Sequence, residues 1–389
     1  MPFSVQPSRT RDARPNFRVG ELFASPLDVG VWSLIEPAGQ QNHAPQLCWI
    51  SEDELACVWM AGSQEGTSSM SIFGSVLRKG KTRWSKPRLL SQDASRSEQN
   101  PVLFVAPDGR LHLIHTAQLT RPPGDESWQA QGQAFSMQWT AKLRHQSTSR
   151  WGQRWTRAQD LIDTPAFCRQ PPVASPDGGL LLPIYRSLES GGAFGHDHSS
   201  VLPLDANVQV QGVPFEVPNS TGRVHGSIVR SGDGERWLQF FRSRLADCIY
   251  RSIGSLDGRH WTPPEAVPLP NNNSSIQAVR LHSGLLVMAF NRTSAGRDPE
   301  RKWGESIWPH TRWPLSLAVS EDDGATWPWI RDIDFGLGYC GEANWHQNMQ
   351  LAYPSIVEGQ EDELHLAYSW GNRAAIRHVC LTVGDVMGR

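Results

Sequence analysis

A turn signal that recurs along the chain is the sequence feature that most constrains its fold. Each copy is a short polar segment with an apolar run on either side. Gly and Asp in such segments favour tight turns, and short apolar or alternating runs favour β-strands. The six copies are SEDE at 51–54, PDG at 107–109, PDG at 176–178, GDG at 232–234, HSG at 282–284 and GQEDE at 359–363. The chain is therefore predicted to contain six β-hairpins.

The spacing of these hairpins indicates one structural unit for each copy. Successive turns lie about 50–80 residues apart, which is enough for a four-stranded sheet and its loops. A closed ring of about four to eight such sheets is the β-propeller architecture. We therefore expect an all-β fold, a six-bladed β-propeller with four-stranded antiparallel blades. Residues 1–30 are expected to form an N-terminal extension, and residues 31–389 a single propeller domain.

A second repeated pattern supports this fold. SEDDGATW at 320–327 matches the Asp-box, Ser-x-Asp-x-Gly-x-Thr-Trp, in full, and SLDGRHW at 255–261 is one residue short. SVLRKGKTRW at 75–84 and STSRWGQRW at 147–155 keep Ser, Gly and Trp but lose Asp. In such a turn Asp accepts hydrogen bonds from backbone N–H groups, Gly takes a positive φ and Trp fills the gap beside the next strand. The pattern predicts a structural turn between the outer two strands of a blade, without a catalytic role.

Composition and charge limit the classes of partner. The formal net charge is −2, and no lysine run or basic helix is present, so we expect neither nucleic acid nor a membrane as partner. The N-terminal segment has no apolar core of a secretory signal, which favours a cytoplasmic location. The six cysteines show no CxxC spacing and GHDH at 195–198 fits no standard zinc site. We therefore expect no metal and no cofactor. The oligomeric state stays open.

The hairpins bring particular side chains to one end of the propeller axis. Because the strands are antiparallel, the start of each first strand and the end of each second strand lie at the same pole, away from the turn. The second strands end in Arg186, Arg242 and Arg292, and the first strands begin near His43, Asn100, Arg169, His225, Gln277 and Tyr353. Clustered guanidinium groups repel one another unless an anion lies between them, and a carboxylate matches their paired N–H donors best. Salt bridges between blades are the alternative for each arginine.

The order of these segments resembles the sialidase (BNR/Asp-box) superfamily, in particular its bacterial sialidase-like branch. The resemblance covers about residues 35–383. It rests on NHAPQL, WMAGSQEG, RSEQNPVLF, LPNNNSSIQAV, RWPLSLAVSEDDGATW, YPSI and YSWGNRAAIRHV. It implies the propeller fold. It is less specific for the reaction, because the superfamily includes hydrolases, lyases and members without assigned activity.

The resemblance also implies roles for individual residues. Sialidases hold the sugar carboxylate with three arginines, and by position Arg242 and Arg292 match two of them. Arg186 or Arg169 is the candidate third.

A tyrosine at the start of the corresponding strand is the sialidase nucleophile, and here this residue is Tyr353; a hydrogen-bonded core tyrosine is the alternative. Glu189 is the candidate carboxylate that activates it, and Glu98 competes for that role. Asn100, Glu98 and Gln277 are further candidate contacts of the substrate.

The chain departs from sialidases at two points. No Arg-Ile-Pro segment occurs near the N-terminus, where FRVGEL is the nearest segment. The place expected for the general acid in the first blade holds His43 and no acidic residue. Histidine transfers protons near neutral pH, and His225 begins another hairpin at the same pole. A structural role is the alternative for each histidine.

Three functions follow from this set of residues. The leading one is a hydrolase of the exo-glycosidase type, which releases a terminal acidic sugar such as sialic acid from glycans. The second is a polysaccharide lyase acting on a uronate-containing glycan, with His43 or His225 as the base. The third is a non-catalytic propeller that binds acidic glycans. The identity of the sugar and its linkage stay open.

Overall fold

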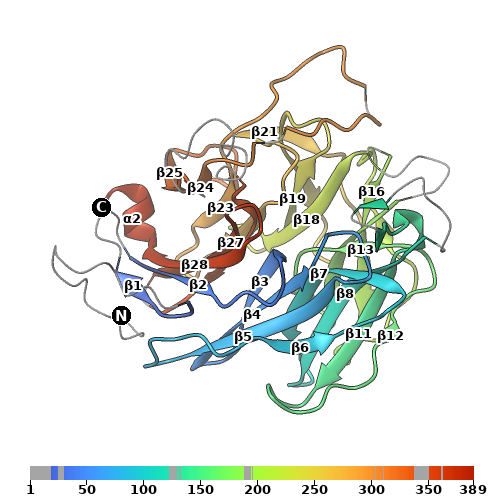
Figure 1. Cartoon of the computed structure of the whole chain (residues 1–389). Coiled ribbons are helices and arrows are strands. Elements are labelled where there is room, and N and C mark those ends of the chain that lie inside the picture. The colour runs from blue at the N-terminus through green and yellow to red at the C-terminus, as the bar shows by residue number, and fades with distance from the viewer. Residues whose placement is uncertain are drawn as a thin grey trace.

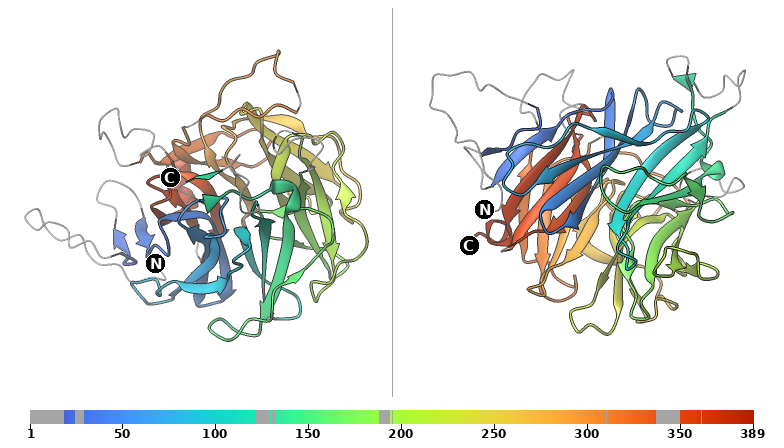
Figure 2. Two further views of the ribbon diagram at one scale, coloured as in Figure 1. Left: turned by 45° about the vertical axis from the view of Figure 1, so that its right-hand side comes forward. Right: turned by 90° about the horizontal axis from the view of Figure 1, so that it is seen from below.

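The computed structural model describes residues 19–24, 30–121, 129–130, 133–187, 194, 196–302, 304–309, 311–336, 350–360 and 362–389. Apart from one separate two-stranded pair, the strands of these residues form six antiparallel sheets that follow one another in chain order around a ring (Figures 1 and 2). The predicted all-β, six-bladed propeller with four-stranded blades is therefore confirmed.

Each of the first three blades is a meander whose first strand is innermost. Blade 1 contains β3 (Gln41–Ser51), β4 (Glu54–Gly62), β5 (Ser71–Arg78) and β6 (Arg88–Ser91). Blade 2 contains β7 (Arg96–Val105), β8 (Leu111–Leu119), β11 (Lys142–Thr148) and β12 (Gln159–Asp160). Blade 3 contains β13 (Phe167–Cys168) and β14 (Val173–Ala174), which both pair with β15 (Leu180–Arg186), then β16 (His198–Leu204) and β17 (Phe215–Glu216).

The second half of the ring continues this plan. Blade 4 contains β18 (Arg223–Arg230), β19 (Trp237–Ser243), β20 (Cys248–Gly254) and β21 (Glu265–Pro270). Blade 5 contains β22 (Gln277–Arg280), β23 (Leu286–Asn291), β24 (Leu315–Ser320) and β25 (Trp329–Asp334). Blade 6 contains β26 (Ala352–Glu358), β27 (Glu363–Trp370) and β28 (Ala375–Thr382). The short elements outside the meanders are β9 (Gln129–Ala130), β10 (Gln133–Ala134), the 3₁₀ turn η2 (Gln138–Thr140) and helix α2 (Val383–Met387).

The two ends of the described chain close the ring. The outer strand of blade 6 is β2 (Val31–Ile35), which pairs antiparallel with β28, and β1 (Phe23–Ala24) extends the same sheet. Neither end of the sequence completes a blade alone, so closure joins residues that are about 350 positions apart in the chain.

The Asp-box has the structural role that the sequence predicts. Asp322 accepts hydrogen bonds from the backbone N–H and the hydroxyl of Thr326, at 2.8 and 2.6 Å. Gly324 adopts a φ of 80° and donates its N–H to the Ser320 hydroxyl. Trp327 packs edge-on against Phe240 of blade 4, with ring centroids 6.2 Å apart. The motif therefore joins two neighbouring blades.

The inner strands are also tied to one another around the axis. The Gln46 side chain accepts a hydrogen bond from the Leu103 N–H at 2.8 Å, and Gln277 accepts one from the Ile356 N–H at 2.9 Å. The core itself lies between adjacent sheets, where apolar side chains such as Phe240 of blade 4 meet Phe290 of blade 5. Cross-blade bonds of this kind fix the inner strands and the loops that follow them.

Two further findings concern membrane-crossing helices and the cysteines. No helix in the described part of the chain has the length and apolar character to cross a bilayer. The five cysteines within the described residues carry free thiols, and Cys340 lies outside that part.

Candidate functional site

A cavity of about 680 Å³ opens at the pole opposite the six hairpin turns. Asn100, His225 and Tyr353 reach it from the first strands of their blades, and Arg242 reaches it from the end of a second strand. This is the pole at which the sequence analysis expects the site.

Backbone irregularities aim the first-strand residues at this cavity. The inner strands of blades 1, 2, 4 and 6 each lose register with their neighbour over one short step. Within that step a non-glycine residue has a positive φ: Ala44 (53°), Asn100 (49°), His225 (56°) and Tyr353 (58°). This conformation is unfavourable for L-residues, and bulges of this kind commonly redirect a side chain. Three of the four residues line the cavity.

The loops between second and third strands supply most of the charge. Five blades each contribute one charged lining residue from this connection: Glu65, Arg121, Arg244, Arg312 and Arg373. With Arg242, the lining contains five guanidinium groups and one carboxyl group among the described residues. This excess of positive charge in a partly enclosed space favours an anionic ligand.

Tyr353 is buried at the centre of this charge. Its hydroxyl oxygen accepts a hydrogen bond from Nη1 of Arg242 at 2.6 Å. Burial alone raises the pKa of the phenol, but the guanidinium groups of Arg242 and Arg312 outweigh it, and the pKa of Tyr353 lies below its ordinary value. Compared with a tyrosine in water, the environment therefore stabilises the phenolate, which is the nucleophilic form.

Arg242 forms hydrogen bonds with two neighbouring side chains, and one of its guanidinium nitrogens has no partner in the described part of the chain. Its Nε donates to Oδ1 of Asn273 at 2.7 Å, in the NNNSS segment, and Nη1 donates to Tyr353. Its Nη2 is buried and has no hydrogen-bond partner among the described residues. The same holds for Nη1 of Arg312, whose pKa burial lowers to about 10. Two unpaired N–H donors beside one phenol are costly unless a ligand accepts from them.

Two other arginines of the lining, Arg244 and Arg373, each form an ion pair with an acidic residue. Nε of Arg244 donates to Oδ2 of Asp197 at 2.6 Å, and both side chains are buried. Nη1 of Arg373 pairs with Oε2 of Glu65 at 2.5 Å. Arg242 and Arg312, whose guanidinium groups lie over the Tyr353 ring, have no acidic partner among the described residues.

Glu65 is the acidic residue that the sequence analysis did not find. It lies in the loop between β4 and β5 of the first blade and lines the same cavity as Tyr353. The sequence analysis finds His43 and no acidic residue at the general-acid position of this blade, whereas Glu65 reaches the cavity from the following loop. WMAGSQEG contains the signal, because a carboxyl group follows the end of the second strand at the axial pole.

The two predicted histidines lie on either side of Tyr353. The His43 and Tyr353 ring centroids are 4.3 Å apart, and those of His225 and Tyr353 are 5.4 Å apart. His225 lines the cavity, and its Nε2 is 3.3 Å from the Tyr185 hydroxyl. His43 lies behind the phenol, with Nδ1 2.7 Å from the Ser369 hydroxyl. Burial and the nearby arginines lower the pKa of both histidines well below the ordinary value.

Two predicted arginines lie outside the cavity. Arg292 is half exposed and forms an ion pair with Asp332 of β25. It therefore does not reach the propeller axis, where the sequence analysis expects it. Asn291 takes the inward position in that blade and bonds to the Pro314 and Leu351 carbonyls. In blade 3, Tyr185 lines the cavity, and Arg186, the next residue of the strand, does not. Successive strand residues face opposite sides, which explains both cases.

Arg169 is buried beneath the site. Its Nη2 donates to the carbonyl groups of Pro45 and Tyr353, at 3.0 Å each, and to that of Pro354 at 3.3 Å. Burial lowers its pKa to about 10. Arg169 thus links the inner strands of blades 1 and 6 and lies 5.5 Å from the Tyr353 ring centroid without lining the cavity.

The other predicted residues are distributed as follows. Glu98 is buried behind the lining and bonds to Ser91 and His115, and Gln277 makes the inter-blade bond described above. Asn100 lines the cavity. Glu189, the candidate activating carboxylate, lies outside the described residues.

Aromatic side chains form part of the cavity rim. Trp308 and Phe194 contact each other edge to face, with ring centroids 5.1 Å apart. The Arg242 and Arg244 guanidinium groups lie 5.4 and 5.5 Å from the Trp308 ring centroid. Trp308 therefore lies beside the charged groups and presents a flat apolar surface at the rim, of a kind on which sugar rings pack.

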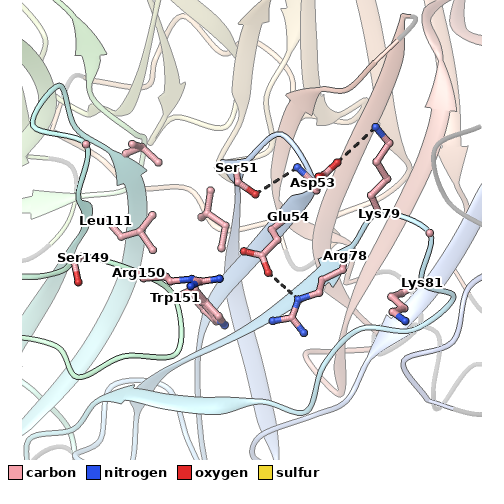
Figure 3. Close-up of a pocket in the computed structure, with 14 residues that line it drawn as sticks. Ser51, Asp53, Glu54, Arg78, Lys79, Lys81, Leu111, Ser149, Arg150 and Trp151 are labelled. Carbon is pink, nitrogen blue, oxygen red and sulfur yellow. Dashed lines mark hydrogen bonds and ion pairs between the residues drawn. The ribbon is translucent and has the colours of Figure 1, made fainter.

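A second hollow, of about 660 Å³, lies at the hairpin-turn pole between blades 1 and 2 (Figure 3). Its charged side chains are paired locally: Arg78 with Glu54 at 2.7 Å, and Lys79 with Asp53 at 3.6 Å. It contains no buried ionisable group next to a nucleophile. The chemistry therefore favours the axial cavity as the functional site.

Comparisons with known proteins agree with this fold. A family model described as a BNR repeat-like domain matches residues 53–366. A search of curated proteins finds no match.

Three solved structures illustrate the likeness. The Hadza microbial sialidase Hz136 is 12% identical and has a TM-score of 0.66 over 90% of this chain and 67% of its own. The NanB sialidase from Streptococcus pneumoniae is also 12% identical, with a TM-score of 0.66 over 91% and 70% of the two chains. A protein of unknown function from Dyadobacter fermentans is 15% identical, with a TM-score of 0.67 over 90% and 98%. These TM-scores demonstrate a shared fold, and at identities this low the likeness shows the fold alone.

Proposed function

Because the chain belongs to the BNR repeat-like domain family, whose model matches most of its length, we propose that it is a sialidase-like glycoside hydrolase. In this proposal it binds the carboxylate of a terminal acidic sugar, sialic acid or a relative, and releases that sugar from glycans. One observation carries the proposal: Arg242 and Arg312 each direct a buried, unpaired N–H group beside the Tyr353 phenol.

The charge balance favours a carboxylate ligand. Arg244 and Arg373 already have acidic partners, whereas Arg242 and Arg312 do not have one among the described residues. A carboxylate has two oxygens and accepts from two guanidinium groups at once, which would satisfy both orphan donors. Trp308 lies against the same arginines and would cover one face of the ring.

The proposed reaction uses two residues of this lining. The phenolate oxygen of Tyr353 attacks the anomeric carbon, and the bond to the leaving oxygen breaks as Glu65 gives that oxygen a proton. Glu65 then takes a proton from water, whose oxygen displaces the phenolate and releases the sugar. In its resting state the phenol is neutral and Glu65 is a carboxylate paired with Arg373. The ion pair opens first, and the freed Glu65 carboxylate takes the proton of the Tyr353 phenol, which gives the phenolate and the protonated acid that the attack requires.

Turnover of aryl sialosides and related nonulosonic acid glycosides tests the proposal. We expect the wild-type protein to release the aryl group, and Tyr353→Phe to lose this activity while its circular dichroism spectrum stays unchanged. Tyr353→Phe removes a single hydroxyl group and keeps the ring that contacts both histidines. Folded wild-type protein that turns over no member of the panel would contradict hydrolysis. Saturable binding of the free acid without any product would instead favour a non-catalytic acidic-glycan binding protein.

His225 favours a second candidate, a lyase acting on a uronate-containing glycan. Its Nδ1 is buried without a partner among the described residues, beside Tyr353 and Tyr185. Such a histidine would take the proton from C5 while an arginine neutralises the uronate carboxylate and a tyrosine protonates the leaving oxygen. The product is an unsaturated uronate that absorbs in the near ultraviolet. A flat absorbance trace with uronate-rich polysaccharides would remove this candidate.

A further inference from the structure

A second group of reactive side chains lies in blade 6, at the hairpin-turn end of the sheet. Glu363 and His365 are two residues apart on β27 and therefore share a face, and Cys380 of β28 is the direct partner of His365 in the ladder. These two strands lie side by side in Figure 1. All three side chains are buried, with exposed fractions of 6%, 0% and 6%. The proposed hydrolysis makes no use of this cluster.

The spacing of the three ligand atoms fits a small tetrahedral ion. Nε2 of His365 lies 3.7 Å from Oε2 of Glu363 and 3.8 Å from Sγ of Cys380, and the three atoms all lie within 4.8 Å of one another. Zinc bonds of about 2.0–2.3 Å to nitrogen, oxygen and sulfur place neighbouring ligands of a tetrahedron roughly 3.4–3.6 Å apart. The two distances from His365 exceed these values by only a few tenths of an ångström, and the third pair, Glu363 and Cys380, lies within the 4.8 Å bound.

Three details point from these atoms to a bound cation. Oε2 of Glu363 is buried and has no hydrogen-bond partner among the described residues. The other ring nitrogen of His365, Nδ1, lies 3.1 Å from Nε2 of His378, an outer contact of the kind that orients metal-binding histidines. Gly359 packs against His365, and a Cβ at this position would lie 2.9 Å from Nε2. A larger residue there would occupy space next to the ligand atom.

Blade 2 repeats the histidine pair without the other ligands. His112 and His145 stack with ring centroids 5.1 Å apart at 4°, and His365 and His378 stack at 5.4 Å and 7°. Ser147 pairs with His112 where Cys380 pairs with His365. The position two residues before His112 is Arg110, whereas Glu363 precedes His365. Blade 6 thus differs from its internal counterpart by two substitutions that both supply metal ligands.

We propose that Glu363, His365 and Cys380 form a binding site for Zn²⁺ or a similar divalent transition-metal ion, with water as the fourth ligand. Thiolate and imidazole ligands together with a carboxylate favour zinc over calcium or magnesium. Binding replaces the thiol proton of Cys380, which leaves to solvent. The site departs from the expectation that the chain binds no metal.

Metal titration of protein without a polyhistidine tag tests the proposal. After treatment with a chelator, the wild-type protein is titrated with ZnCl₂ against a chromophoric chelator, and separately with CoCl₂. We expect one equivalent of Zn²⁺ and, with Co²⁺, a near-ultraviolet band from the thiolate–cobalt bond. Cys380→Ser should lose the band and weaken Zn²⁺ binding by more than about 100-fold, because outer-shell changes alone cost about 10–100-fold. Cys168→Ser, at a buried thiol of blade 3, is the matched control and should keep both.

Gly359→Ala probes the space around the ion with all three ligands intact, and we expect it to weaken Zn²⁺ binding by about tenfold. The cobalt measurement on wild-type protein needs no variant, so a variant that fails to fold does not obscure the answer. Wild-type protein that gives no cobalt–thiolate band and binds less than one equivalent of Zn²⁺ overturns the proposal. Unchanged binding in Cys380→Ser does so too.

Discussion

The arginines in and around the cavity differ in how their charge is compensated, and this difference separates the proposed ligand-binding arginines from the structural ones. Arg244 and Arg292 each have a carboxylate partner, and Arg169 donates to three carbonyl oxygens. Arg242 and Arg312 keep buried N–H groups without partners among the described residues. A charged donor left unpaired in a protein interior destabilises the fold, so such groups are expected where a ligand completes them.

Arg242→Lys keeps the positive charge and removes the planar pair of donors. We expect the affinity for an acidic monosaccharide to fall by about one to two orders of magnitude, the equivalent of one charge-assisted hydrogen bond. Isothermal titration calorimetry measures this change. Arg292→Lys, at the corresponding strand end but paired with Asp332 outside the cavity, is the control and should bind as wild type does. Unchanged affinity together with a clearly lower melting temperature would assign Arg242 a structural role.

Glu65→Gln removes the proposed proton donor and keeps its size. We expect kcat to fall by about 10²–10⁴-fold for a substrate with a poor leaving group, and much less for an aryl glycoside, whose leaving oxygen needs no proton. Steady-state kinetics on both substrates measures the contrast. An equal loss on both substrates would indicate that Glu65 acts only through its ion pair with Arg373.

At the scale of the strand and the turn, the sequence predicts the scaffold better than the site. Gly and Asp in the six turns and the Asp-box residues act locally, so their roles follow from a few neighbouring residues. The inward or outward direction of a strand-end side chain instead depends on the register, and a shift of one residue reverses it. Arg242 lines the cavity, whereas in blade 5 Asn291 is buried against the Leu351 carbonyl and Arg292 pairs with Asp332 outside the cavity.

The residues that the sequence analysis missed belong to connections without a repeating pattern. Glu65, Arg244, Arg312 and Arg373 all lie beyond the ends of second strands, in loops of different length. Their common position is visible only once the strand ends are known. The metal cluster was missed for another reason, because its ligands come from two strands and show no short spacing of the kind found in zinc motifs.

The Asp-box turn between β24 and β25 allows a test at this scale. Asp322→Ala removes three hydrogen bonds, from Ser320 and from two groups of Thr326. We expect the free energy of unfolding to fall by about 1 kcal/mol, because the turn is exposed to solvent, and ligand affinity to stay unchanged. Urea denaturation and calorimetry measure the two quantities. A loss of ligand affinity would mean that a change in this turn alters the cavity at the opposite pole, which would contradict a purely structural role for the Asp-box.

For the molecule as a whole, packing of the sheets buries several histidines fully or in part, both at the axis and within the blades. Burial is the main cause that lowers the pKa of five histidines below the ordinary value: His43, His112, His145, His225 and His378. In an unfolded chain these rings titrate near pH 6.5.

This difference predicts how stability depends on pH. Below about pH 6.5 the unfolded chain binds protons that the folded protein excludes, so unfolding takes up protons and stability falls as the pH falls. Each histidine contributes up to about 1.4 kcal/mol per pH unit until its folded-state pKa is reached. Carboxyl groups with lowered pKa, such as Asp233, add to the loss only nearer pH 4.

We therefore expect the free energy of unfolding to be level from pH 8 to pH 7 and to drop steeply between about pH 6.5 and pH 5. Urea denaturation at fixed pH steps measures the curve, and its slope gives the number of protons taken up. His378→Asn, at a buried ring outside the cavity, should reduce that slope by up to one proton. A stability curve that stays level down to pH 5 would show that the interior histidines accept protons in the folded ring.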